Sequence, residues 1–428
     1  MRRTLSVFVV LLLSVCSLSV YGKKKKSEKA NVVKMSTLFK AASTAISKNP
    51  QQAAAAEKKL LEALPREDVS QKQRAKIYYT AAKLQECQNG VENRKAYLKT
   101  AWDTAKYFSP LLQMYQYLQK CDSIDSMPDS TGKVKLKYAS KTRSLRKKYR
   151  ENIINGAKFY LSKKDYTLAY PYLDFYLQYC KDKTDSIYTR YARWATLCGF
   201  LNKSPRQTLS YIDVAIASAD SAQKPLFQEY KAKSYLMLND EKMWISSLDE
   251  GLRNYPEYDY FFVNRLDAYY SLHQYREGIM LADSMLKTVA DKNIYWFAKC
   301  KIALAEARYD NCIEYADSII KRDNKYVDAY YNKGVAYLNL AVIAQETACN
   351  DLTDPKCQED HRNIKGFYQL AKPCMEMVRK LQPNNIERWG NALYRIYLNL
   401  NMGEEFDQID KLLEKKQEPK ADQKANKG

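Results

Sequence analysis

The stretch RYDNCIEYADSIIKRDNKYVDAYYNKGVAY runs from Arg308 to Tyr337 and reads as two amphipathic helices joined by a short polar turn. Cys312 stands in the first helix, at a position where a small residue would pack. Gly334 stands within the second helix, where glycine costs about 1 kcal/mol relative to alanine. A small residue at each point predicts that another helix comes unusually close there.

The same pattern recurs at a fixed period. Tyr309 aligns with Tyr275, and an equal step further back along the chain reaches Glu241. Three units follow one another without a gap and a fourth begins at Val327; they are Pro225–Tyr258, Asp259–Lys292 and Asn293–Tyr326. Such a period indicates a repeat architecture, in which each unit buries its apolar face against its neighbours.

The period and pattern resemble those of the tetratricopeptide repeat, a helix–turn–helix unit of about 34 residues. The signature of that family sets large, aromatic and small residues at fixed positions of the two helices. The matching residues are Tyr330, Gly334 and Tyr337 in one unit, Trp389 in another, and Ala157, Tyr160, Tyr166 and Ala169 in a third. The resemblance covers about residues 149–415 and is poor before Lys133, and Leu393 stands where a small residue is usual.

The resemblance implies an all-α fold: a right-handed superhelical solenoid of antiparallel helix pairs, preceded by a degenerate helical region. It also implies that two positions of each unit, where its helices approach most closely, share a fixed volume. The residues at these positions are Ala232 with Trp244, Leu266 with Gly278, Ala157 with Ala169, and Cys300 with Cys312. We therefore predict that Cys312 packs against Cys300, and that Gly334 faces the second helix of the unit that begins at Val327.

The composition agrees with a helical chain and limits its chemistry. Its 428 residues include 12 Gly, 12 Pro and 36 Tyr, but only 2 His, which leaves little room for histidine-based catalysis or metal binding. The net charge of +21 favours an anionic partner or surface. No catalytic motif is present, so we expect a protein that is not an enzyme and has no cofactor.

The first 22 residues, MRRTLSVFVVLLLSVCSLSVYG, join two arginines to a short apolar run, which is typical of a secretory signal peptide. We expect cleavage after Gly22. The alternatives are a lipoprotein modified at Cys16 and an uncleaved anchor. The chain is thus predicted to be exported, and to be periplasmic or outer-membrane-associated. With its repeats, it resembles exported envelope tetratricopeptide-repeat proteins of Bacteroidetes-type bacteria.

The patterns divide the chain into segments. These are the signal peptide at 1–22, a basic linker at 23–36, N-terminal helical hairpins at 37–132, a basic connecting segment at 133–148, the repeat array at 149–416 with an insertion at about 341–365, and a disordered tail at 417–428. Within the hairpins, Ser70 followed by Gln73 has the spacing of a capping box and predicts the start of a helix.

The resemblance also implies a binding groove on the concave face, lined by the first helix of each unit. The residues placed there are Lys233, Tyr260, Val263, Asp267, Tyr270, Phe297, Lys301 and Tyr331, with Glu229, Leu236, Ile294, Leu304, Asp328, Val335 and Leu338 beside them. This mixture suits a peptide or helix of another protein, although several of these aromatic side chains can instead pack against their neighbours. The inferred function is a non-catalytic scaffold that binds another protein of the bacterial cell envelope.

The densest basic run in the body of the chain suggests a competing function. From Lys133 to Arg150 there are nine basic residues and no acidic one. We predict that four of them bind an anionic membrane or cell-wall polymer: Arg143, Arg146, Lys147 and Lys148. The alternative is a solvated helix face. A structural tether is therefore the second candidate function, and a glycan-binding outer-membrane lipoprotein is the third. Nucleic acid is not expected as a partner of an exported chain.

Two cysteines of the insertion are candidates for a covalent link. Cys349 and Cys357 lie close together in the chain, near His361 and several carboxylates. A disulfide between these cysteines is the prediction for an oxidising compartment. Free thiols are the alternative, and a metal site would have only three soft ligands at irregular spacing.

Overall fold

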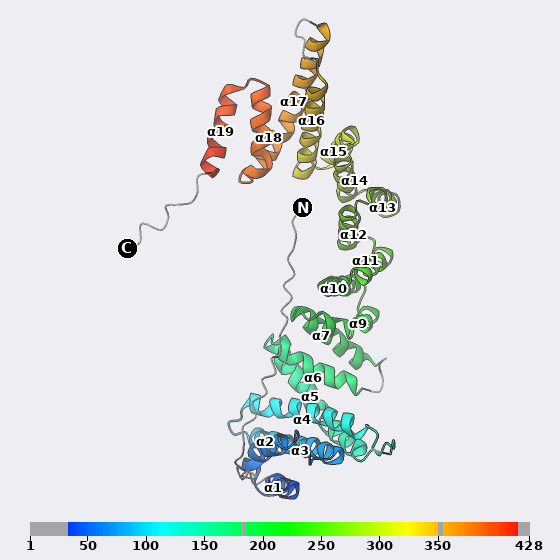
Figure 1. The fold of residues 1–428 in the computed structure, drawn as a ribbon, viewed down its shortest axis with the longest axis vertical. Helices are drawn as coiled ribbons and strands as arrows, with labels where there is room; N and C mark the ends of the chain where they lie inside the picture. The colour runs from blue at the N-terminus through cyan, green and yellow to red at the C-terminus, as the bar shows by residue number, and fades with distance from the viewer. Residues whose placement is uncertain (1–32, 130, 181–182, 184, 350–353, 418–428) are drawn as a thin grey trace, which may run out of the picture. The chain divides into compact units, whose positions relative to one another are not determined.

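The structure is a computed structural model that describes residues 33–129, 131–180, 183, 185–349 and 354–417. Every regular element in these residues is a helix, as the all-α prediction requires (Figure 1). The elements are α1 (Met35–Ser47), η1 (Pro50–Gln52), α2 (Ala53–Glu62), α3 (Gln71–Tyr97), α4 (Thr104–Asp125), α5 (Ala139–Ser162), α6 (Tyr166–Gln178), α7 (Ser186–Leu201), α8 (Pro205–Leu209), α9 (Ile212–Ser218), α10 (Lys224–Met237), α11 (Glu241–Asn254), α12 (Asp259–Ser271), α13 (Tyr275–Thr288), α14 (Asn293–Ala305), α15 (Tyr309–Arg322), α16 (Val327–Thr347), α17 (Pro355–Leu381), α18 (Ile386–Asn399) and α19 (Gly403–Gln417).

Some predicted segments lie outside the described residues. They are the signal peptide with Cys16, residues 23–32 of the basic linker, and residues 418–428 of the tail. In the part of the chain that the structure describes, no helix is both long enough and apolar enough to cross a membrane.

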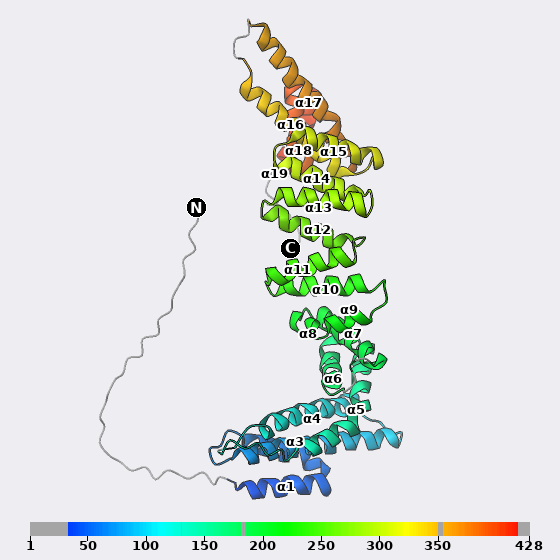
Figure 2. The ribbon, with the colours of Figure 1, turned by 90° about the vertical axis from the view of Figure 1, so that its right-hand side faces the viewer.

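The first compact unit, Met1–Gly156, is built around the long helices α3 and α4, which pack side by side (Figure 2). The predicted capping box opens α3: the Gln73 N–H donates to Ser70 Oγ at 3.3 Å, and the Ser70 N–H donates to Gln73 Oε1 at 2.8 Å. Leu60 of α2 and Ile77 of α3 are fully buried in the core that α1, α2 and α3 share.

The boundary between the two compact units falls at Gly156 and Ala157, within α5. Because α5 begins at Ala139, residues 139–148 of the segment expected to connect the hairpins to the array are part of this helix.

The second compact unit, Ala157–Gly428, stacks helix pairs in chain order (Figure 2). The second helices α11, α13 and α15 begin at Glu241, Tyr275 and Tyr309, so their starts are evenly spaced along the chain. The first helices α12 and α14 begin at Asp259 and Asn293, with the same spacing. The structure thus confirms the repeating helix pair that was found in the sequence.

The turn within each pair also repeats. Asn239, His273 and Ala307 occupy the same place and have φ values of 55°, 55° and 56°, in the left-handed region. That conformation costs a non-glycine residue about 1–2 kcal/mol. The left-handed conformation is stabilised because the residue after it in the chain donates its N–H to a carbonyl of the last turn of the first helix. The bonds are Asp240 N to Tyr235 O (3.0 Å), Gln274 N to Tyr269 O (2.8 Å) and Arg308 N to Ala303 O (2.8 Å).

The close-contact positions within a pair behave as predicted. Cys300 Sγ and Cys312 Sγ lie 3.5 Å apart, and both residues are fully buried free thiols. In the preceding pair the same place is filled by one large residue. A Cβ added at Gly278 would lie 3.4 Å from Leu266 Cδ1 and 2.7 Å from Ile302 Cδ1. Two thiols and a leucine opposite a glycine are therefore alternative ways to fill one space.

The insertion lengthens a helix pair. The helices α16 and α17 pack against each other along their extended lengths, so most of the added residues are helical. A Cβ added at Gly334 would lie 2.7 Å from Met375 Cε and 3.2 Å from Cys374 Cβ, both on α17. This contact confirms that Gly334 faces the second helix of its pair.

The buried tyrosines predict how stability changes at alkaline pH. Burial is the main cause that raises the pKa of Tyr170, Tyr326 and Tyr397 from 10.0 to about 12. The folded state therefore holds these protons more tightly than the unfolded state. Their contribution is complete below pH 10 and is lost as the pH rises toward 12. We expect phenolate absorbance and loss of helical circular dichroism to rise together in that interval. Titration of these three tyrosines near pH 10 with intact helices would contradict this.

Candidate functional site

The predicted groove residues all lie on the first helices α10, α12, α14 and α16, and we call their outward side chains the first-helix face. Val263 and Asp267 are exposed, whereas Tyr260, Tyr270, Phe297 and Tyr331 are half-buried. Two neighbours differ from the prediction. Leu338 is buried in the core of the last helix pairs, and Glu229 is also buried. These two residues therefore support the face and do not line it.

The first cation on this face links α10 to α12. Lys233 forms an ion pair with Glu229 on its own helix, and its Nζ lies 5.2 Å from the ring centroid of Tyr260. Tyr258 donates a hydrogen bond to the same Glu229 carboxylate. Burial, followed by the charge of Glu229, raises the pKa of Tyr260 above its usual value. The tyrosine is therefore neutral at physiological pH and presents a hydroxyl that can donate.

The next two cations repeat this arrangement. Lys301 Nζ on α14 lies 3.3 Å from Asp267 Oδ1 and 4.4 Å from the Tyr270 ring, both on α12. Arg388 on α18 pairs with Asp328 of α16 and lies 4.5 Å from the Tyr331 ring. Each cation thus lies against an aromatic ring of a neighbouring first helix and pairs with an acid, which is on that same neighbouring helix for Lys301 and Arg388 and on its own helix for Lys233. The aromatic rings of the face are fixed in place before any partner binds.

Phe297 is partly committed to its own repeat. Its ring centroid lies 5.7 Å from that of Tyr326, with an interplanar angle of 50°. The expectation that some aromatic side chains of the face pack against neighbours therefore holds for this residue. Val263, with 36% of its surface exposed, is a cleaner probe of the face.

A hollow between two earlier helices of the array was missed by sequence reasoning. It has a volume of about 390 Å³ and lies between α5 and α7. Its lining is mainly apolar: Leu161, Trp194 and Leu197, with Lys158 and Ser162. Leu161 lies on α5 and Trp194 and Leu197 lie on α7, and the repeat pattern alone did not place these residues on one surface.

Sequence reasoning also missed a ladder of ion pairs between successive repeats. Basic residues at 265, 299 and 333 pair with aspartates at 249, 283 and 317, always at the same separation in the chain and with the period of the repeat. Their cationic side chains are only 13%, 13% and 19% exposed. The pairs are Arg265 with Asp249 (2.7 Å), Lys299 with Asp283 (2.7 Å), and Lys333 with Asp317. The ladder joins each second helix to the first helix of the following repeat, and its spacing is visible in the sequence.

The prediction of an anionic-surface site is wrong for part of the basic run. Arg146 is buried, and its Nη1 lies 2.6 Å from Asp122 Oδ2. Lys148 lies 2.7 Å from Glu86 Oε1, although its side chain is still 62% exposed. Only Arg143 and Lys147 of the four remain exposed without such a pair in the described residues. One face of α5 turns inward, which a count of charges along the chain does not reveal.

The predicted disulfide between Cys349 and Cys357 is also wrong, because the structure holds both residues as thiols. Cys357 is buried, and its thiol lies 3.0 Å from the carbonyl oxygen of Cys349. Within the described ranges, no group of three or more His, Cys, Asp and Glu side chains is placed to hold a metal ion.

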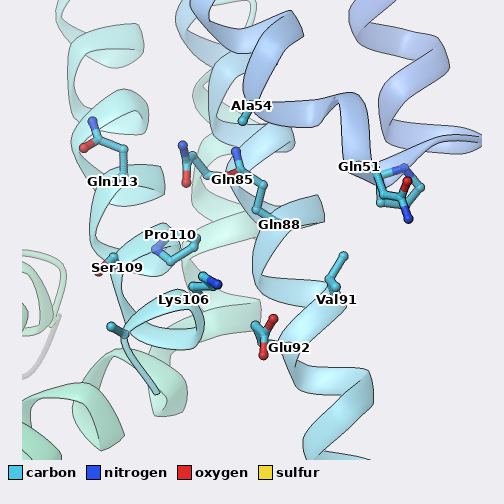
Figure 3. A pocket seen from close by; sticks show the side chains of 12 residues that line it. Gln51, Ala54, Gln85, Gln88, Val91, Glu92, Lys106, Ser109, Pro110 and Gln113 are labelled. Atoms are coloured by element: carbon cyan, nitrogen blue, oxygen red, sulfur yellow. The ribbon is translucent and has the colours of Figure 1, made fainter. Parts of the chain in front are cut away.

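A cavity with a volume of about 550 Å³ lies in the first unit, between α2, α3 and α4 (Figure 3). Gln85 and Gln88 project from α3, with Gln113 of α4 across from them (Figure 3). Both α3 amides donate to the buried Glu57 carboxylate, at 2.6 and 2.9 Å, and Tyr117 donates at 2.7 Å. These donors therefore stabilise a buried charge and are not available to a ligand.

A scan against protein-family models and a search of curated proteins give no match. Solved structures similar to this chain include the C-terminal part of a repeat protein from Cytophaga hutchinsonii, with 11% identity, 60% of this chain and 92% of that chain covered, and a TM-score of 0.42. A repeat protein from Bacteroides fragilis is also similar, with 16% identity, 61% of this chain and 98% of that chain covered, and a TM-score of 0.30. Another, from Parabacteroides merdae, has 14% identity, 62% of this chain and 98% of that chain covered, and a TM-score of 0.34. The helix pairs and turns of the second unit repeat with the period of about 34 residues that is typical of the tetratricopeptide repeat, so this unit has the fold of a tetratricopeptide-repeat solenoid.

Proposed function

We propose that this protein is a non-catalytic interaction scaffold that binds a segment of another protein along the first-helix face. The observation that carries the proposal is the repeated set of cations, each placed between an acid and an aromatic ring of a neighbouring helix. Such a surface is largely preorganised, so less side-chain entropy is lost when a partner binds.

The chemistry of the face indicates what the segment presents. Val263, Tyr270 and Phe297 offer apolar surface, and the hollow beside Trp194 can take a large apolar side chain. Lys233 and Lys301 are already paired, yet their side chains keep 41% and 36% of their surface exposed. A partner carboxylate can therefore share these cations. We propose a peptide or helix with apolar anchors and acidic residues between them.

The proposed partner is another protein of the bacterial cell envelope. This part of the proposal is supported by the leader-like residues 1–22, which are typical of export. The mature chain would then act in the periplasm or at the outer membrane.

A matched pair of variants tests the binding face. Val263→Glu places a charge on the first-helix face, whereas Met280→Glu makes the same kind of change on the second helix of that repeat, where Met280 is 61% exposed. We expect Val263→Glu to weaken partner binding roughly ten-fold or more, because a carboxylate would have to be desolvated in the complex. Met280→Glu should bind like the wild type. Binding is measured with the partner recovered from the envelope, and both variants should keep wild-type circular dichroism. Equal affinities for both variants would sink the proposal.

A further inference from the structure

The connection between α3 and α4 exposes large apolar side chains on a short tip, which we define as residues 94–106. Tyr97 is 86% exposed, Leu98 is 61% exposed and Trp102 is 42% exposed. Few apolar side chains elsewhere in the described residues are as exposed as Tyr97 and Leu98. A cluster of this kind in water usually marks a surface that binds something.

The backbone of the tip is held in place. Lys99 has a φ of 55°, and the Thr100 N–H closes the end of α3 by donating to Lys95 O at 3.0 Å. The buried Glu92 accepts from the Asp103 N–H at 2.9 Å and pairs with Lys95 at 2.8 Å. The exposed side chains are therefore displayed by an ordered turn.

The tip is also basic. Residues 94–106 contain four basic side chains and one acidic one, which gives a net charge of +3. Lys95 and Lys106 pair with Glu92 and Asp103. For Arg94 and Lys99, the described residues place no carboxylate within ion-pair distance. Arg94 and Lys99 thus lie beside the apolar side chains, and neither cation has a partner of opposite charge in that part of the chain.

We propose that this tip docks on an anionic lipid surface, with Tyr97, Leu98 and Trp102 entering the interfacial layer and Arg94 and Lys99 at the level of the lipid phosphates. Tryptophan and tyrosine favour this layer because each joins an apolar ring to a polar group. Basic residues beside them are attracted to acidic headgroups. Three side chains on one turn are few for a protein interface, which usually buries about 800 Å² on each partner.

The inference goes beyond the scaffold function and is independent of it. The tip lies in the first compact unit, whereas the first-helix face lies in the second. Variants of one surface therefore leave the residues of the other unchanged.

Sedimentation with lipid vesicles tests the proposal on the full-length protein. The vesicles contain phosphatidylcholine alone or an equimolar mixture with phosphatidylglycerol. The wild type should bind the mixture and bind phosphatidylcholine much more weakly. The tip variant combines Tyr97→Ser, Leu98→Ser and Trp102→Ser, and should bind the mixture roughly ten-fold less or weaker, because its buried apolar surface is lost.

The matched control removes three exposed apolar side chains at the start of the predicted basic run and just before it: Met127→Ser, Val134→Ser and Leu136→Ser, which are 50%, 52% and 60% exposed. It should bind like the wild type.

Arg94→Gln with Lys99→Gln should reduce the preference for phosphatidylglycerol. Unchanged binding of the tip variant overturns the proposal. So does a wild type that ignores vesicles while the tip variant loses a protein partner, because the tip would then be a protein-binding site.

Discussion

Gly199→Ala is expected to lower the stability of the helices around α7 by about 3 kcal/mol. A Cβ at this position would lie 2.5 Å from the backbone nitrogen of Thr208 and 2.8 Å from the carbonyl carbon of Gln207. Both atoms belong to the backbone of α8, so no side-chain rotation can relieve the contact. The two helices must separate, which also weakens the packing of α9 against α7.

Native-state hydrogen exchange measures this locally, which suits a repeat array that need not unfold in one step. Amide protons of α7 should exchange faster in the variant. The control is the same substitution at Gly366 in α17, where no atom lies within 4 Å of an added Cβ. Gly366→Ala should stabilise its helix by about 1 kcal/mol, because alanine is the better helix former. Equal effects at the two glycines would show that the α7–α8 contact is not close.

The second large effect is expected at Cys300 and Cys312. Cys300→Leu should destabilise the repeat by about 3 kcal/mol, because the space opposite is filled by a thiol whose sulfur lies 3.5 Å from Cys300 Sγ. Adding Cys312→Gly should recover part of that loss. The double variant copies the preceding repeat, where Leu266 is opposite Gly278. If the two side chains share one volume, the effects of the two substitutions on the free energy of unfolding must be non-additive.

A double-mutant cycle measured by denaturant unfolding tests this claim. We expect a favourable coupling of about 1–2 kcal/mol between the two substitutions. The glycine itself costs about 1 kcal/mol in a helix, so recovery should be incomplete. Additive effects of the two substitutions would contradict the shared volume, and would mean that the thiols fill separate spaces.

The fold could be predicted from the sequence because the repeat requires residues of matched size at each close contact between helices. Cys312 and Gly334 were unusual in their helices, and the repeat period explained both. The structure confirms the explanation at Cys300 and at Met375. A periodic sequence pattern predicts packing volume well, since the two helices of every unit must fill the same space between them.

Side-chain partners across the fold were predicted less well. Arg146 was assigned to a surface because a run of charges does not show which side of a helix is buried, and its partner Asp122 stands on the preceding helix, α4. The short spacing between Cys349 and Cys357 likewise gives no distance between sulfurs. The ladder of aspartates and basic residues was detectable, since its separation repeats with the period, but the small and aromatic positions that define the repeat do not include it.

The central claim is that a partner binds the first-helix face, and site-specific photocrosslinking tests it most directly. A photoreactive phenylalanine analogue is placed at position 263 or at position 280, and the protein is irradiated in its native envelope. The account predicts a discrete crosslinked protein at position 263 and little or none at position 280, although the side chain at 280 is the more exposed of the two. Crosslinking to the same proteins at both positions, or only at 280, would contradict it.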